Sequence, residues 1–140
     1  MPSNPNAPAP GSSPRSVAAQ RKHLEQDLQQ QVVKFLRKSL VGRSVVFHVP
    51  NGGRRGFLEA QRFKRMGVLA GMVDLGVVND GRLIGLELKA GKGRISDAQA
   101  WCHRQLNAAG APVFVCRTVA EVKDALLSMG VPLYVDGKFL

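Results

Sequence analysis

The sequence predicts an α/β fold in which a mixed central β-sheet is flanked by helices. Some segments repeat apolar residues every three or four positions, which is typical of amphipathic helices, and others are β-branched and aromatic, which is typical of strands. Their order is helix, strand, helix, hairpin, helix, strand and helix, and helices that separate strands in this way cover a sheet. With 140 residues, of which 44% are hydrophobic, the chain can bury one modest core.

The beginning of the chain differs from the rest in composition. Residues 1–20 hold five of the eight prolines and lack both acidic residues and apolar periodicity, so we predict a disordered N-terminal tail there and one folded domain over residues 21–140. The domain is expected to open with a helix over residues 23–40, which Gly42 ends.

The next elements follow from turn and capping signals. Asp80-Gly81 lies between two apolar runs and predicts a hairpin turn. Ser96 with Gln99, and Thr118 with Glu121, each predict a capping box at the start of a helix. The expected elements are a strand over 44–49, a helix over 57–66, hairpin strands over 72–78 and 82–90, a helix from 96 to Gly110, a strand over 112–116, a helix from 118 to Gly130 and a final strand over 132–135.

Net charge gives the first indication of function. Lys and Arg total 20 against 10 Asp and Glu, which gives +10 and a pI near 10.5. Such a surplus indicates a polyanionic partner, most commonly nucleic acid, although composition alone leaves RNA, an acidic protein or a merely soluble basic domain open. Aromatic residues make up 6% of the chain, which disfavours a binder of single-stranded RNA.

The two cysteines, Cys102 and Cys116, lie in apolar patterns without metal-ligand spacing, and we interpret them as reduced core thiols. We find neither an apolar run of membrane-spanning length nor the apolar segment of a signal peptide, so we expect no membrane partner. The expected location is the cytoplasm, at the nucleoid or, for a viral protein, in the host cytoplasm.

Charged residues on the hairpin suggest chemistry. Side chains alternate along a strand, so Glu87 and Lys89 share one face, and the hairpin can bring Asp74 towards them. Two carboxylates in an apolar sheet repel each other unless a cation lies between them, and Mg²⁺ prefers such a ligand set together with water and phosphate oxygens. The alternative is that Glu87 and Lys89 form an exposed pair and that Asp74 is a surface residue.

Five blocks in the same order and at compatible spacing resemble the VRR-NUC family of the PD-(D/E)XK nuclease superfamily. The blocks span most of the chain, roughly residues 24–127. They are Glu25 with Leu28-Gln29, His48-Val49-Pro50-Asn51-Gly52, Gly71-Met72-Val73-Asp74-Leu75, Gly85-Leu86-Glu87-Leu88-Lys89 and Ser96-Asp97-Ala98-Gln99. Val73 departs from the family, since the superfamily motif usually has proline there; that proline shapes the strand entry and performs no chemistry.

The resemblance implies a restriction-endonuclease-like core and a site that uses Mg²⁺ or Mn²⁺. Asp74 and Glu87 would be metal ligands, Lys89 the catalytic lysine, Glu25 an acid that holds the metal directly or through water, and Gln99 a polar residue facing the site. For two of these residues a purely local role stays open, because Glu25 can be a solvated helix acid and Gln99 can simply pair with Ser96 in the capping box.

Two basic clusters are candidates for contacts with DNA phosphates. The first follows the glycine-rich turn and consists of Arg54, Arg55, Arg62, Lys64 and Arg65. The second, Lys92 and Arg94, lies in the glycine loop after the predicted catalytic strand, and should flank the cleavage site. A solvated face is the alternative for both clusters.

The resemblance therefore implies a metal-dependent, structure-selective DNA endonuclease. Stand-alone members of the family are associated with homodimers that cut branched DNA such as four-way (Holliday) junctions. Two other interpretations stay open, namely a flap or general DNA endonuclease and a non-catalytic DNA-binding module with the same fold.

Overall fold

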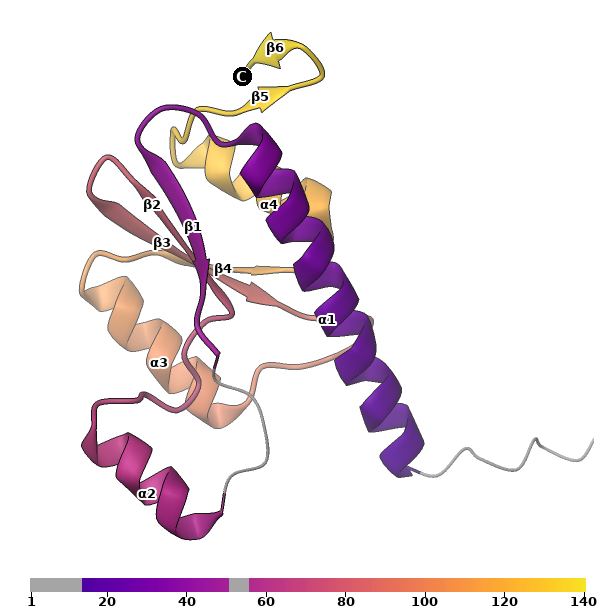
Figure 1. Ribbon diagram of the computed structural model, residues 1–140, viewed down its shortest axis with the longest axis vertical. Helices are drawn as coiled ribbons and strands as arrows, with labels where there is room; N and C mark the ends of the chain where they lie inside the picture. The colour runs from indigo at the N-terminus through magenta and orange to yellow at the C-terminus, as the bar shows by residue number, and fades with distance from the viewer. Residues whose placement is uncertain (1–13, 51–55) are drawn as a thin grey trace, which may run out of the picture.

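A four-stranded mixed sheet lies at the centre of the computed structural model, which describes residues 14–50 and 56–140 (Figure 1). The elements in chain order are α1 (Pro14–Ser39), β1 (Ser44–His48), α2 (Phe57–Arg65), β2 (Leu75–Asn79), β3 (Arg82–Leu88), α3 (Asp97–Ala108), β4 (Val113–Cys116), α4 (Val119–Ser128), β5 (Tyr134–Val135) and β6 (Lys138–Phe139). The sheet order is β1-β2-β3-β4, with antiparallel pairs except for the parallel β3 and β4. This confirms the predicted mixed sheet flanked by helices.

The hairpin between β2 and β3 has the predicted two-residue turn. Asp80 and Gly81 have φ values of 46° and 79°, as a type I′ turn requires, and Asn79 pairs with Arg82. The turn sets the register of the two strands, so Leu75 lies opposite Leu86 at the far end. That register decides which residues meet in the candidate site.

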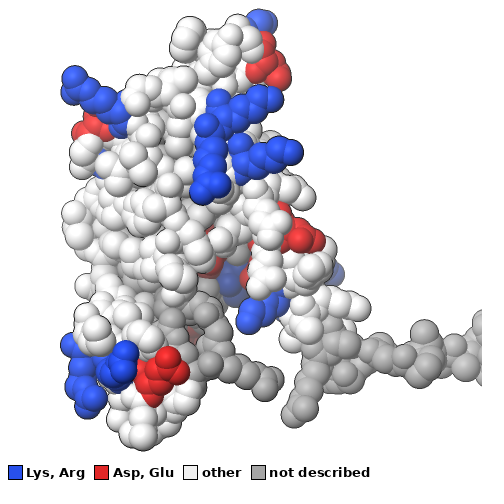
Figure 2. All heavy atoms as spheres, viewed as in Figure 1, with Lys and Arg blue, Asp and Glu red and all other residues white. Residues whose placement is uncertain are grey.

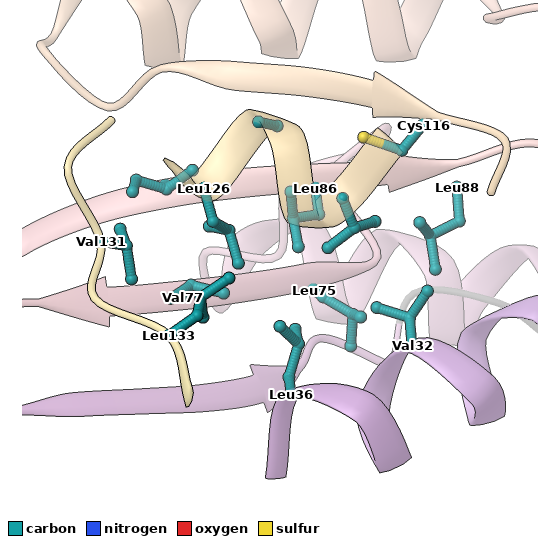
Figure 3. Close-up of a cluster of buried hydrophobic side chains, with 13 residues drawn as sticks. Val32, Leu36, Leu75, Val77, Leu86, Leu88, Cys116, Leu126, Val131 and Leu133 are labelled. Atoms are coloured by element: carbon teal, nitrogen blue, oxygen red, sulfur yellow. The ribbon is translucent and has the colours of Figure 1, made fainter. Parts of the chain in front are cut away.

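One face of the sheet carries the hydrophobic core. Leu86 and Leu88 of β3 pack with Leu36 of α1 and Leu126 of α4, all at most 2% exposed (Figure 3). Because side chains alternate along β3, Glu87 between these leucines points to the other face, where its carboxylate contacts α3. Helices α1 and α4 therefore cover the core face and α3 covers the face that holds the candidate site.

The first helix is longer than predicted. It begins at Pro14, whereas the periodicity predicted a start at residue 23, so the last part of the expected tail is helical. Proline is well suited to the first helical position, and Ala18 and Ala19 favour helix without adding an apolar stripe. Residues 17–24 are exposed, which is why no periodic pattern marks them. The expectation for residues 1–13 lies outside the described residues.

Two further details differ at the C-terminal end. Thr118 caps α4 as predicted, but the Glu121 carboxylate accepts from the backbone N–H of Arg117, so the reciprocal capping box does not form. The predicted strand over 132–135 is shorter, and β5 pairs with β6 in a small hairpin.

Across the described residues, we find no helix long and apolar enough to span a membrane.

Candidate active site

Asp74 and Glu87 meet where β2 and β3 end. Asp74 directly precedes β2, one position beyond the pair of Leu75 with Leu86, and this extension of the register brings it opposite Glu87. The Asp74 Oδ2 atom accepts from the backbone N–H of Leu88 at 2.8 Å, and the negative charge of Asp74 is close enough to raise the pKa of Glu87. The two carboxyl groups are therefore neighbours on the same side of the sheet.

Three polar side chains surround the Glu87 carboxyl group, which is 1% exposed. Gln99 Nε2 donates to Oε1 at 2.7 Å, and Lys89 Nζ lies 3.7 Å from the same oxygen. His103 Nε2 lies 3.4 Å from Oε2. Both oxygens are thus oriented by residues of α3, with Lys89 just past β3 beside them, and the alternative of an exposed pair formed by Glu87 and Lys89 is excluded.

Burial and like charge raise the pKa of Glu87 to about 8. Desolvation is the largest cause, followed by the negative charge of Asp74, while Lys89 partly opposes the shift. Near neutral pH, the pair therefore retains a proton unless another positive charge is present. A divalent cation is the species that would allow both carboxylates to ionise, so the two side chains fit a hard metal ion.

His103 was not among the residues predicted for this site. Burial and the charge of Lys89 lower the pKa of His103, which favours its neutral imidazole, and its Nε2 atom lies 3.4 Å from Glu87 Oε2. The sequence did contain a signal, since His103 follows Gln99 by four residues and so lies on the same face of α3. Periodicity alone assigns that position to packing.

Gln99 has both of the roles that the sequence offered as alternatives. Its Oε1 atom accepts from the backbone N–H of Ser96 at 2.9 Å, which closes the capping box, and its Nε2 atom donates to Glu87. The start of α3 also lies against the segment before Asp74. A Cβ atom on Gly71 would come within 2.4 Å of the Ala98 backbone, so glycine is required for this approach.

Glu25 lies near the pair without completing a cluster. Its Oε1 atom is 3.4 Å from the backbone nitrogen of Ala90, just past β3, and its charge contributes to the raised pKa of Glu87. Glu25 is half-buried, so it is not a fully solvated helix acid. Among residues 14–50 and 56–140, no three His, Cys, Asp or Glu side chains are grouped closely enough to hold an ion.

A cleft of about 520 Å³ opens beside Asp74. Its wall includes Glu25 and Gln29 of α1, His48 at the end of β1, and Gln99. His48 Nδ1 lies 2.7 Å from the carbonyl oxygen of Asp74 and 3.1 Å from Gln29 Nε2, so this imidazole lies between α1 and the strand end that carries the carboxylate. The cleft gives a ligand access to Asp74.

The basic residues predicted to contact DNA are exposed where the structure describes them. Arg62, Lys64 and Arg65 lie on α2, and Figure 2 shows basic side chains gathered over α2 and over the upper part of α1. Lys92 and Arg94 are exposed in the loop after β3. Arg54 and Arg55 lie outside the described residues.

The loop after β3 is held in place by Arg117. The guanidinium group donates to the carbonyl oxygens of Gly91 at 2.7 Å and Gly93 at 2.8 Å.

The two cysteines are free and buried, which confirms the prediction of reduced core thiols.

Of the comparisons with known proteins, the one with solved structures identifies a class of protein for this fold. No protein-family model matches the chain, and no curated protein matches it. A solved structure described as a VRR_NUC domain protein has 26% sequence identity and a TM-score of 0.59, over 75% of this chain and 86% of that chain. The mixed sheet and the four helices of the described residues thus have a VRR-NUC nuclease fold. This match supports the assignment of the chain to the VRR-NUC family.

Proposed function

We propose that this protein is a Mg²⁺- or Mn²⁺-dependent endonuclease that hydrolyses phosphodiester bonds in DNA. The observation that carries the proposal is the convergence of the Asp74 and Glu87 carboxyl groups, with Lys89 beside them, at the end of a hairpin whose register is set by its turn. A protein that only binds DNA gains nothing from two acids aimed at phosphate, because both repel it.

Each residue around the pair has a definite task in this proposal. Asp74 and Glu87 would hold the metal ion, which when bound supplies Lewis acidity towards a phosphate oxygen. Gln99 and His103 fix the Glu87 carboxylate by hydrogen bonds to its two oxygens. Lys89 is placed to donate to a phosphate oxygen or to the attacking water as negative charge develops. Glu25 would act at the edge of the site through water.

The substrate class follows from charge and from family. Exposed basic residues on α2 and in the loop after β3 favour a polyanion, and no base-reading motif is evident in the sequence, so recognition by shape is proposed. We propose four-way junctions as the preferred substrate and a homodimer as the active form, because two symmetric cuts resolve a junction and a two-fold dimer supplies two matched sites.

The test is a cleavage assay on labelled four-way junction, flap and linear duplex DNA. Each substrate is incubated with Mg²⁺, Mn²⁺ or EDTA, and with wild type or the Asp74→Ala variant. We expect junction cutting that requires the metal and falls by about 10²-fold or more in the variant.

Other outcomes separate the alternatives. Equal cutting of flaps or of linear duplex would replace junction selectivity by a broader endonuclease activity. Binding without cutting in any metal would contradict the nuclease proposal and leave a DNA-binding module.

A further inference from the structure

A second hollow on α1 adjoins the cleft beside Asp74. This hollow has a volume of about 640 Å³ and begins at Gln29, which also lines the cleft beside Asp74. Its other walls are Gln30, Val33, Lys34, Arg37 and Lys38. The cleft and the hollow share Gln29 as a lining residue, so they adjoin each other along α1.

The hollow is positively charged and its charges are not neutralised. Lys34, Arg37 and Lys38 are exposed, and among the described residues none has a carboxylate within ion-pair distance. Their stretch of α1 contains no acid after Asp27, whose carboxylate faces His23 at 3.7 Å. Figure 2 shows the resulting group of basic side chains over the upper part of α1.

Helix stability accounts for part of this pattern. Arg37 and Lys38 lie in the last turn of α1, where positive charge offsets the helix dipole. Lys34 lies a turn earlier and gains little from that effect. The dipole also does not explain why the three charges border one hollow that adjoins the cleft.

We propose that the surface formed by Lys34, Arg37 and Lys38 binds the phosphate backbone of the duplex arm on one side of the cleaved bond. The inference rests on the proposed function for its choice of DNA as the polyanion. Along α1, Lys34 and Lys38 lie about 14 and 20 Å beyond Glu25 at 1.5 Å per residue. At about 3.4 Å per base pair, these residues reach phosphates roughly four to six base pairs from the site.

The test measures binding in EDTA, so that it does not depend on cleavage. The affinity of the full-length protein is measured over a salt series for junctions and duplexes with arms of about 5 or about 15 base pairs. The short arms end near the surface formed by Lys34, Arg37 and Lys38, and the long arms extend beyond it. The test variant is Lys34→Gln/Lys38→Gln. The matched control, Lys123→Gln/Lys138→Gln, removes the same charge from α4 and β6.

Loss of two phosphate contacts lowers the slope of log affinity against log salt by up to about 1.8, and affinity at about 0.1 M salt by up to about 60-fold. We expect the full loss for long arms and a smaller loss for short arms, which reach the Lys34 contact but end before that of Lys38, while the control changes affinity by less than about threefold. Thermal unfolding of both variants checks that the fold is intact.

Two results would overturn the inference: equal losses in test and control variants, or a loss that is the same for short and long arms. Either would mean that the surface acts through general charge and not through contact. The proposed nuclease function is tested separately, by cleavage. It fails if the wild-type protein does not cut DNA in Mg²⁺ or Mn²⁺, whatever the binding assay shows.

Discussion

Replacement of Gly71 by alanine tests whether the close approach of the Asp74 segment to α3 shapes the site. Gly71 has a φ of 78°, and an added Cβ atom would lie 2.4 Å from the Ala98 backbone and 2.5 Å from the Gln99 nitrogen. Gly81 in the hairpin turn has nearly the same φ, 79°, but nothing lies within 4 Å of its Cβ position. Both substitutions place alanine at a positive φ, but only Gly71→Ala also creates a steric overlap with neighbouring backbone.

The structure sets the size of the expected difference. A left-handed conformation costs a non-glycine residue about 1 kcal/mol, so Gly81→Ala should lower the free energy of unfolding by about that amount. In Gly71→Ala the overlap with backbone can be relieved only if the Asp74 segment and α3 separate by about 1 Å. We expect a further loss of about 1–3 kcal/mol.

Urea denaturation followed by far-ultraviolet circular dichroism and by the fluorescence of the single tryptophan, Trp101, measures both losses. Because the separation moves Asp74 relative to Gln99, Gly71→Ala should also reduce junction cutting by about 10²-fold, with Gly81→Ala close to wild type. Free energies of unfolding that agree within about 0.5 kcal/mol would refute the reasoning, since no overlap would then need to be relieved.

Two further predictions concern the charges of the site. The fold raises the pKa of Glu87 from its ordinary value of 4.5 to about 8. Between these two pH values the folded protein binds one more proton at Glu87 than the unfolded chain does. The free energy of unfolding in EDTA therefore falls as pH rises, by at most about 1.4 kcal/mol per pH unit. Denaturation from pH 5 to 8 should show this decline for wild type but not for Glu87→Gln, and parallel curves would contradict it. Lys89→Met should reduce the rate of cutting by about 10²-fold or more while the thermal shift on addition of Mg²⁺ persists, because Lys89 is proposed to act on the phosphate and not on the metal. A variant that cuts at the wild-type rate would remove Lys89 from the proposed chemistry.

Most of the fold could be predicted because local signals agreed with it. The turn at Asp80-Gly81 set the hairpin, and the Ser96 capping box set the start of α3. The start of α1 was missed because its first turns are exposed, and an exposed helix needs no apolar stripe. Of the capping box predicted at Thr118, only the Thr118 side-chain cap formed. The Glu121 carboxylate accepts from the neighbouring N–H of Arg117, because several backbone N–H donors are within its reach at the start of a helix.

The site was predictable where strand alternation applies and not where tertiary packing decides. Alternation placed Glu87 on the face opposite the core, the hairpin brought Asp74 towards it, and the resemblance supplied Glu25 and Gln99. His103 was missed because a histidine in an apolar helix pattern looks like packing until the distance to Glu87 is known. The register of Asp74 also depends on where β2 begins, which a sequence fixes only to within a residue or two.

The two hydrogen bonds from Arg117 to the carbonyls of Gly91 and Gly93 have a consequence for binding. A glycine loop that moved freely would lose conformational entropy on meeting a polyanion, and affinity would fall accordingly. Because Arg117, just past β4, holds this loop by two hydrogen bonds, the loop keeps its shape in the free protein. Lys92 and Arg94 are therefore presented from a scaffold that is ordered before any DNA arrives.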